Sequence, residues 1–138
     1  MQLRFILTLF GIITLSLSDA QVISHIGTWE SKDVENPMQM VLDDDGFITF
    51  IVNKRSLGGK HYISEGKHLS MCYETTYTDT IGTISILVKD CKTKRVLQRA
   101  TGKLTFTGPN NIELCFKKPL NEERTEFTDE CVSFLKVK

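Results

Sequence analysis

Apolar and polar residues alternate along most of this chain, in short stretches separated by clusters of Gly, Asn, Asp and Pro. The alternation is clearest over 38–42, 69–74, 96–106 and 112–116, and a run of β-branched and aromatic residues covers 47–52. A period of two residues bounded by such clusters is typical of β-strands joined by hairpin turns. Helical periodicity is missing over any useful length after residue 20, so the pattern predicts an all-β domain.

The expected strands follow one another at regular spacing. They lie around Trp29 and at Met38–Leu42, Phe47–Val52, Tyr62–Ile63, Leu69–Glu74, Ile81–Val88, Val96–Phe106, Ile112–Phe116 and Cys131–Val137. We interpret 75–80 as a polar connection, 89–94 as a turn and 117–130 as a longer polar segment. Almost every connection is short enough for a hairpin, which favours a meander over a Greek-key sandwich. We therefore predict a single antiparallel up-and-down barrel of about eight strands.

The first twenty residues have a different character. Arg4 precedes an apolar run from Phe5 to Leu17, and Ser18-Asp19-Ala20 places small residues where a signal peptidase cuts. These features predict a secretory signal peptide over 1–20 and a mature domain over 21–138. The apolar run is shorter than the ~20 residues of a membrane-spanning helix, so we expect no membrane span after cleavage. The protein should be secreted or periplasmic.

Charge narrows the range of partners. The 17 Lys and Arg residues are balanced by 17 Asp and Glu, and the two signs are interspersed along the chain. Nucleic-acid-binding proteins carry a concentrated basic patch, and binding to anionic membranes also needs an excess of positive charge. The composition therefore argues against both partners.

All four cysteines, Cys72, Cys91, Cys115 and Cys131, lie in the predicted mature domain. An even number of cysteines in an exported chain predicts two disulfides. A zinc site is disfavoured because no two cysteines lie within four residues of each other. Cys115 shares an outward face with Glu113, and Cys131 begins the strand expected to pair with this one, so we predict a Cys115–Cys131 bond. Cys72–Cys91 follows by elimination, although Cys91 lies in the turn at the far end of the neighbouring strand.

One short motif carries a family resemblance. Ile26-Gly27-Thr28-Trp29-Glu30, at the first strand of a small exported all-β chain, resembles the lipocalins and the lipocalin-like (calycin) families. Asp44-Asp45-Gly46-Phe47 is similar to a hairpin of short bacterial lipocalin-like domains, and Leu114-Cys115-Phe116 with Arg124-Thr125-Glu126-Phe127 is similar to their late segments. The resemblance implies a barrel whose tryptophan closes one end and whose interior holds a small apolar ligand. No arginine in the last strand is placed to cover the tryptophan; Lys136 is the basic candidate.

Alternation also predicts which side chains line the barrel. The inward apolar set is Trp29, Met38, Met40, Leu42, Tyr62, Leu69, Met71, Tyr73, Ile84, Ile86, Leu104, Phe106, Ile112, Leu114 and Phe116. A small barrel is just wide enough to be filled by side chains or to hold one small ligand, so a packed core is the alternative to a pocket. The candidate ligand-binding residues are Trp29, Met38, Met40, Tyr62, Met71, Tyr73, Phe106 and Phe116. Methionines give such a lining a pliable surface.

Other chemistry is weakly indicated. His61, Glu65 and His68 are close in sequence, but a turn separates them and the two histidine rings are not expected to face each other, so we interpret them as exposed hairpin residues. The acidic run 43–46 lacks the carboxylate pattern of a calcium loop and is expected to form a hairpin turn. No nucleophile elbow or phosphate-binding loop occurs. We expect no cofactor, no metal and no enzymatic activity.

These observations lead to two hypotheses of different kinds. The first is a lipocalin-like protein that binds a small hydrophobic ligand inside the barrel. The second is a ligand-free barrel that binds a protein partner through its loops, as an inhibitor or an envelope component. A cavity above about 300 Å³ with an open mouth would favour the first hypothesis, and a filled interior with an exposed apolar patch would favour the second.

Overall fold

The computed structural model describes residues 23–32, 35–119 and 127–138. The predicted signal peptide, residues 1–20, lies outside this range, as do 124–126 of the family resemblance. The described residues form ten strands: β1 (Gly27–Ser31), β2 (Met38–Leu42), β3 (Ile48–Val52), β4 (Arg55–Gly58), β5 (Tyr62–Ser64), β6 (Lys67–Thr78), β7 (Ile81–Asp90), β8 (Val96–Gly108), β9 (Asn111–Pro119) and β10 (Phe127–Lys136). Within the described residues, no helix has the length and apolar character to cross a bilayer.

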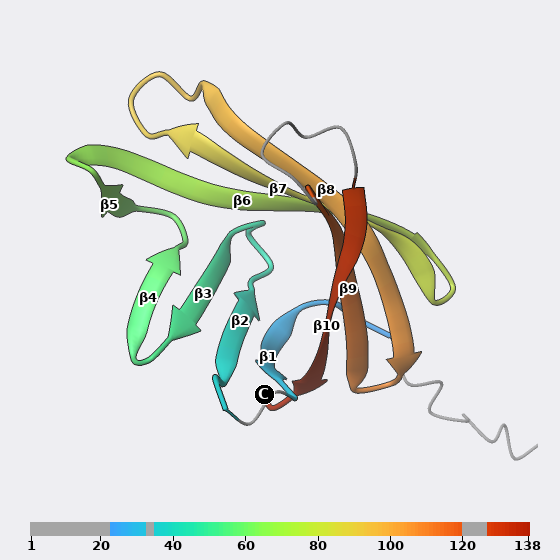
Figure 1. Cartoon of the computed structure of the whole chain (residues 1–138). Coiled ribbons are helices and arrows are strands. Elements are labelled where there is room, and N and C mark those ends of the chain that lie inside the picture. The colour runs from blue at the N-terminus through green and yellow to red at the C-terminus, as the bar shows by residue number, and fades with distance from the viewer. Residues whose placement is uncertain (1–22, 33–34, 120–126) are drawn as a thin grey trace, which may run out of the picture.

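The strands form one antiparallel sheet in the order β4-β3-β2-β1-β10-β9-β8-β7-β6-β5. β1 lies between β2 and β10, so the first and last strands pair with each other as expected for an up-and-down barrel. In Figure 1, β2–β4 lie on one side of the interior and β9–β10 on the other. β6 and β7 cross above both groups, and β8 curves from there down beside β9. The antiparallel all-β barrel predicted from alternation is thus confirmed.

The barrel is nearly closed. At one edge of the sheet, the β2–β3 turn and the end of β4 bond to β6, which pairs with β5 at the other edge. The Tyr73 backbone N–H donates to the Gly46 carbonyl, and that of Met71 donates to the Gly59 carbonyl, each over 2.9 Å. Phe47 and Cys72 form an isolated bridge between these two bonds. The Tyr73 hydroxyl also donates to the carbonyl of Asp43. The β2–β3 turn and the end of β4 are therefore fastened to the middle of β6.

The strands differ from the prediction in two places: one strand is added, and another is longer than expected. Asn53 and Lys54 both have positive φ, at 51° and 65°, which is the backbone of a tight two-residue hairpin, so the chain returns at once as β4. The segment 75–80, expected to be a polar connection, instead continues β6 to Thr78 and turns only at Asp79 and Thr80. Polar threonines are good strand formers, and the paired β7 supplies their backbone partners.

The core of the described residues is a cluster of side chains from β1–β3 and β6–β10. Its fully or almost fully buried members are Trp29, Met40, Leu42, Ile48, Met71, Tyr73, Ile84, Leu104, Phe106, Ile112, Leu114 and Phe134. Most of these were predicted from alternation, and Ile48 and Phe134 were not. Burial of this apolar surface is the main stabilising term for the fold, at roughly 25 cal/mol per Å² removed from water.

Trp29, on β1, belongs to the core cluster. It is fully buried, and its indole N–H donates to the His25 carbonyl over 2.9 Å. A Cβ on Gly27 would lie 2.6 Å from Cε of Lys136 and 2.7 Å from the Lys138 carbonyl oxygen. Gly27 therefore leaves the space in which the Lys136 side chain crosses the end of the barrel. This contact gives the Gly-x-Trp motif a physical reason in this chain.

Cys115 and Cys131 are joined by a disulfide, as predicted. They are directly opposite each other in the β9–β10 register, with Cα atoms 4.1 Å apart. The second pairing was wrong, because Cys72 and Cys91 are free thiols. Cys72 is opposite Leu87, whereas the Cys91 N–H donates to the carbonyl of His68. Four residues along a strand cover roughly 13 Å, well beyond the ~4.4–6.8 Å between the Cα atoms of a disulfide.

Candidate ligand cavity

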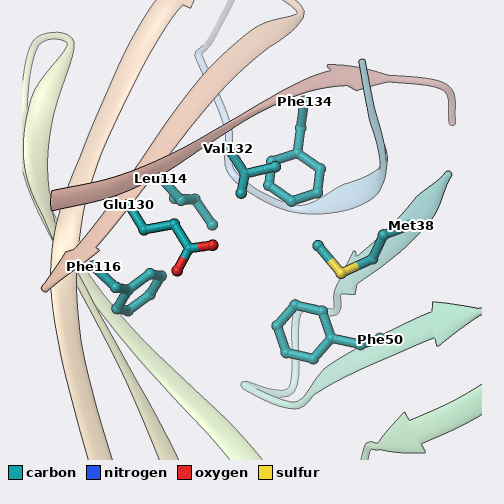
Figure 2. A pocket seen from close by; sticks show the side chains of 7 residues that line it. All are labelled: Met38, Phe50, Leu114, Phe116, Glu130, Val132 and Phe134. Atoms are coloured by element: carbon teal, nitrogen blue, oxygen red, sulfur yellow. The ribbon is translucent and has the colours of Figure 1, made fainter. Parts of the chain in front are cut away.

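An apolar cavity of about 240 Å³ lies in the barrel between two strand pairs. β2 and β3 form one wall, and β9 and β10 form the other. The lining side chains are Met38, Phe50, Leu114, Phe116, Glu130, Val132 and Phe134 (Figure 2). Six of the seven are apolar, so the cavity offers a surface for an apolar molecule with one charged group at its wall.

Strand pairing explains why these residues gather. Glu130 is opposite Phe116, Val132 opposite Leu114, and residues that are opposite in an antiparallel pair point to the same side of the sheet. Cys115 and Cys131 lie one position further along each strand and therefore face outward. The disulfide on the outer face thus holds the register that brings these four side chains to the inner face.

Among the residues that the structure describes, Glu130 is the one charged residue that lines this cavity. It is exposed, so its carboxylate keeps access to water. Figure 2 shows the carboxylate turned into the space between the Phe116 ring and the side chains of Met38 and Phe50. An ionised group in this position combines aqueous contact on one side with an apolar, aromatic surface on the other.

A second hollow, of about 540 Å³, adjoins the first. It is lined by Phe50, Leu57, Met71, Ile86, Val88, Gln98, Arg99 and Ala100. Phe50 lines both spaces. All residues of β8 from Val96 to Thr101 are exposed, whichever side of the strand they face. The interior is therefore filled by the core at one end and opens to solvent beside β8 at the other.

Gly102 shapes the wall of the first cavity. A Cβ at this position would lie 2.7 Å from Cδ1 of Phe116 and 2.7 Å from the Cys115 carbonyl oxygen. The Phe116 ring therefore occupies the space that a larger residue on β8 would take. The close approach of β9 is the feature that requires a glycine at this position of β8.

The structure divides the candidate ligand-binding residues into several groups. Met38 and Phe116 line the first cavity, and Met71 lines the second hollow. Phe106 lines a separate hollow beside the turns at 80 and 107–109. Trp29, Met40 and Tyr73 are buried in the core, and Tyr62 packs against it. The eight residues therefore do not form one site.

Several cavity residues were absent from the candidate list, namely Phe50, Leu114, Glu130, Val132 and Phe134. Leu114 was expected to face inward, but as core. For the other four residues, the side of the sheet that each faces depends on the extent and register of its strand, which alternation predicts only approximately. A signal was present at 130–134, because Glu130, Val132 and Phe134 repeat with the period of a strand. The prediction that the last strand begins at Cys131 left Glu130 outside it, whereas β10 begins at Phe127. Val132 and Phe134 lay within the predicted strand but were not assigned to the inward face.

Polar groups at the Trp29 end are arranged for stability. The His25 ring lies edge-on to Tyr73 and Tyr77, and its Nδ1 is 3.3 Å from the Tyr77 hydroxyl oxygen. Burial, and to a lesser extent the charge of Lys136, hold the pKa of His25 below its usual value. Burial, with a smaller contribution from the Asp43 carboxylate, raises the pKa of Tyr73 to about 12. Tyr73 therefore remains a hydrogen-bond donor at physiological pH.

The expectation that His61 and His68 would not face each other was wrong. Their rings lie 5.0 Å apart, and Nε2 of His61 is 2.8 Å from Nδ1 of His68. Ile63 is opposite His68 in the β5–β6 hairpin, so His61, two residues earlier, returns to the same side. Both side chains are exposed, and they form a surface hydrogen bond outside the cavity.

One further group of described residues brings metal-ligating atom types within 4.8 Å of one another, namely Glu113, Cys115 and Cys131. Both sulfurs belong to the disulfide. Because the thiolate is the form that binds metals, this group offers one carboxylate only.

Comparison of the chain with models of known protein families and with curated protein sequences finds no match.

Proposed function

We propose that this protein is a carrier that binds a small, predominantly apolar molecule in the cavity between β2–β3 and β9–β10. The observation that supports the proposal most directly is an unfilled space of about 240 Å³ whose wall is almost entirely apolar. An apolar cavity of about 150 Å³ in a protein core is sufficient to bind benzene. The space here suits a molecule with one or two rings or a short alkyl chain.

The adjoining hollow supports the same role. Ligand pockets range over about 300–1,000 Å³, and the first cavity alone is slightly smaller than that. The second hollow, of about 540 Å³, shares Phe50 and opens beside β8. A longer ligand would extend past Phe50 into this space. Among the described residues, the wall of the first cavity offers one carboxylate and no convergent set of reactive groups, so we assign the site a binding role and not a catalytic one.

A secreted or periplasmic location fits this role, and the disulfide on β9–β10 supports an oxidising compartment. Such a carrier would hold its ligand away from water during transport. The barrel fold suits this because its backbone groups are paired around the interior, which leaves the lining free to be apolar.

Binding of a neutral apolar fluorophore, N-phenyl-1-naphthylamine, tests the proposal. Two of its three rings would fill the first cavity, and the third would extend past Phe50 into the second hollow. We expect the mature protein to bind it in the micromolar range, about −8 kcal/mol. Val132→Trp places a large ring in the cavity and should weaken binding at least tenfold. Leu135→Trp, on the exposed face of the same strand, is the matched control and should leave binding unchanged. Failure of the unaltered protein to bind the probe would contradict the carrier and favour a barrel that acts through protein contacts.

A further inference from the structure

We infer that the ligand of this cavity is an organic cation, namely a molecule with an apolar body and an ammonium group that pairs with Glu130. The inference rests on the proposed carrier function and specifies the chemical class of the ligand. It follows from where Glu130, the charged residue among the described lining residues, lies and from what surrounds it.

The position of Glu130 is determined by the sheet. Its backbone is opposite Phe116, and the next pair along, Cys131 and Cys115, is covalently joined on the outer face. A shift of one residue would turn Glu130 outward, and the disulfide opposes such a shift. The carboxylate is therefore held on the inner face, beside an aromatic ring.

The surroundings of Glu130 favour positive charge. Its carboxylate shares the cavity with the rings of Phe50, Phe116 and Phe134. The faces of aromatic rings attract cations within about 6 Å, and a carboxylate attracts them more strongly. A ligand carboxylate would instead meet a like charge in an apolar setting, which is unfavourable. The cavity thus selects an amine over a fatty acid of the same length.

The arrangement also orients the ligand. Glu130 is exposed and near water, whereas Phe134 and Leu114 are almost completely buried, at 1% and 3% exposure. An ammonium group placed at Glu130 keeps part of its hydration, and the apolar body extends toward Phe134. A carboxylate has roughly four acceptor positions, so it can receive an ammonium group in addition to contacts within the protein.

Three ligands with the same alkyl chain test this inference. Octylammonium, octanol and octanoate are each used to displace N-phenyl-1-naphthylamine at neutral pH and moderate salt. An ion pair with an exposed carboxylate and a cation over an aromatic face each strengthen binding severalfold, so we expect octylammonium to bind about tenfold more tightly than octanol. Octanoate should be the weakest of the three.

Two variants test whether the Glu130 carboxylate causes the preference for octylammonium over octanol. In Glu130→Gln the naphthylamine should still bind, which shows an intact fold and cavity, while octylammonium and octanol become equal within about twofold. Asp129→Asn removes the same charge from the neighbouring residue, which lines an outer hollow, and should preserve the preference. Equal binding of octylammonium and octanol to the unaltered protein, or loss of the preference in Asp129→Asn, overturns the inference and leaves the carrier standing. Absence of naphthylamine binding overturns both.

Discussion

Lys136 lies over the indole ring of Trp29, with Nζ 5.3 Å from the ring centroid, and the two residues are direct partners in the β1–β10 register. The pair joins the first strand of the barrel to the last. A cation over the face of a tryptophan is attracted by the ring quadrupole, and the aliphatic stem of the lysine covers apolar surface. Lys136, the basic residue of the last strand, thus covers the Trp29 ring. β10 contains no arginine that could make this contact.

This relationship predicts the effect of two substitutions. Trp29→Ala should lower the free energy of unfolding by about 3–5 kcal/mol, as deletion of large buried aromatic side chains does. Lys136→Gln should cost about 0.5–1 kcal/mol, because it removes the charge over the ring. Denaturant titration followed by circular dichroism measures both. Lys103→Gln, at an exposed position of β8, is the control for a simple loss of positive charge. An unchanged midpoint for Trp29→Ala would contradict a closing role for the tryptophan.

The disulfide should contribute strongly to stability. The sequence separation of Cys115 and Cys131 is 16, and closing a loop of this size stabilises by about 3 kcal/mol in the chain-entropy model. The double variant Cys115→Ser/Cys131→Ser should lose about this amount and should also bind the naphthylamine less tightly, because the β9–β10 register lines the cavity. Peptide mapping of the unreduced protein checks the bond itself. Recovery of Cys115 linked to Cys72 or Cys91 would show that the register is different.

Gly102→Ala should change the shape of the cavity by displacing Phe116, one of its lining residues. The added methyl group would overlap the position of the Phe116 ring and the Cys115 carbonyl, so the ring must move toward the cavity. Overpacking of this kind costs about 1–3 kcal/mol, and we expect weaker binding of the naphthylamine as well. Gly66→Ala is an informative comparison, since a Cβ there meets no atom within 4 Å, although its positive φ adds local strain. A Gly102→Ala protein with unchanged binding would mean that Phe116 does not limit the cavity.

His25 should make stability depend on pH. Its pKa is lowered in the folded protein, chiefly by burial and further by Lys136. The unfolded chain therefore binds the proton more readily, and stability decreases as the pH falls from about the unfolded value of 6.5 toward the folded one. Above that window the contribution of His25 is fully present. His25→Gln should flatten this part of the stability profile, as measured by denaturation at a series of pH values. Identical slopes for the variant and the unaltered protein would contradict this assignment.

The sequence by itself determined most of the local architecture. Period-two alternation placed the majority of the strands, and it assigned Trp29 and Met40 to the interior correctly. It also predicted the Cys115–Cys131 bond, since adjacent strands joined by one connection leave few choices of register. In each case the deciding interaction is between neighbours in the sequence or between strands that follow one another, so the pattern contains the necessary information.

The tertiary structure decided the rest. Whether the inner faces of β2–β3 and β9–β10 touch or leave a cavity depends on how the barrel closes across β6, which involves backbone bonds between distant residues such as Tyr73 and Gly46. The same closure separates Trp29 and Tyr73 from the cavity and places Phe50 in it. Glu130 faces inward only because β10 starts at Phe127 and pairs in one register with β9. Alternation specifies which residues share a face, but the distance between two facing strands is set by packing across the whole barrel.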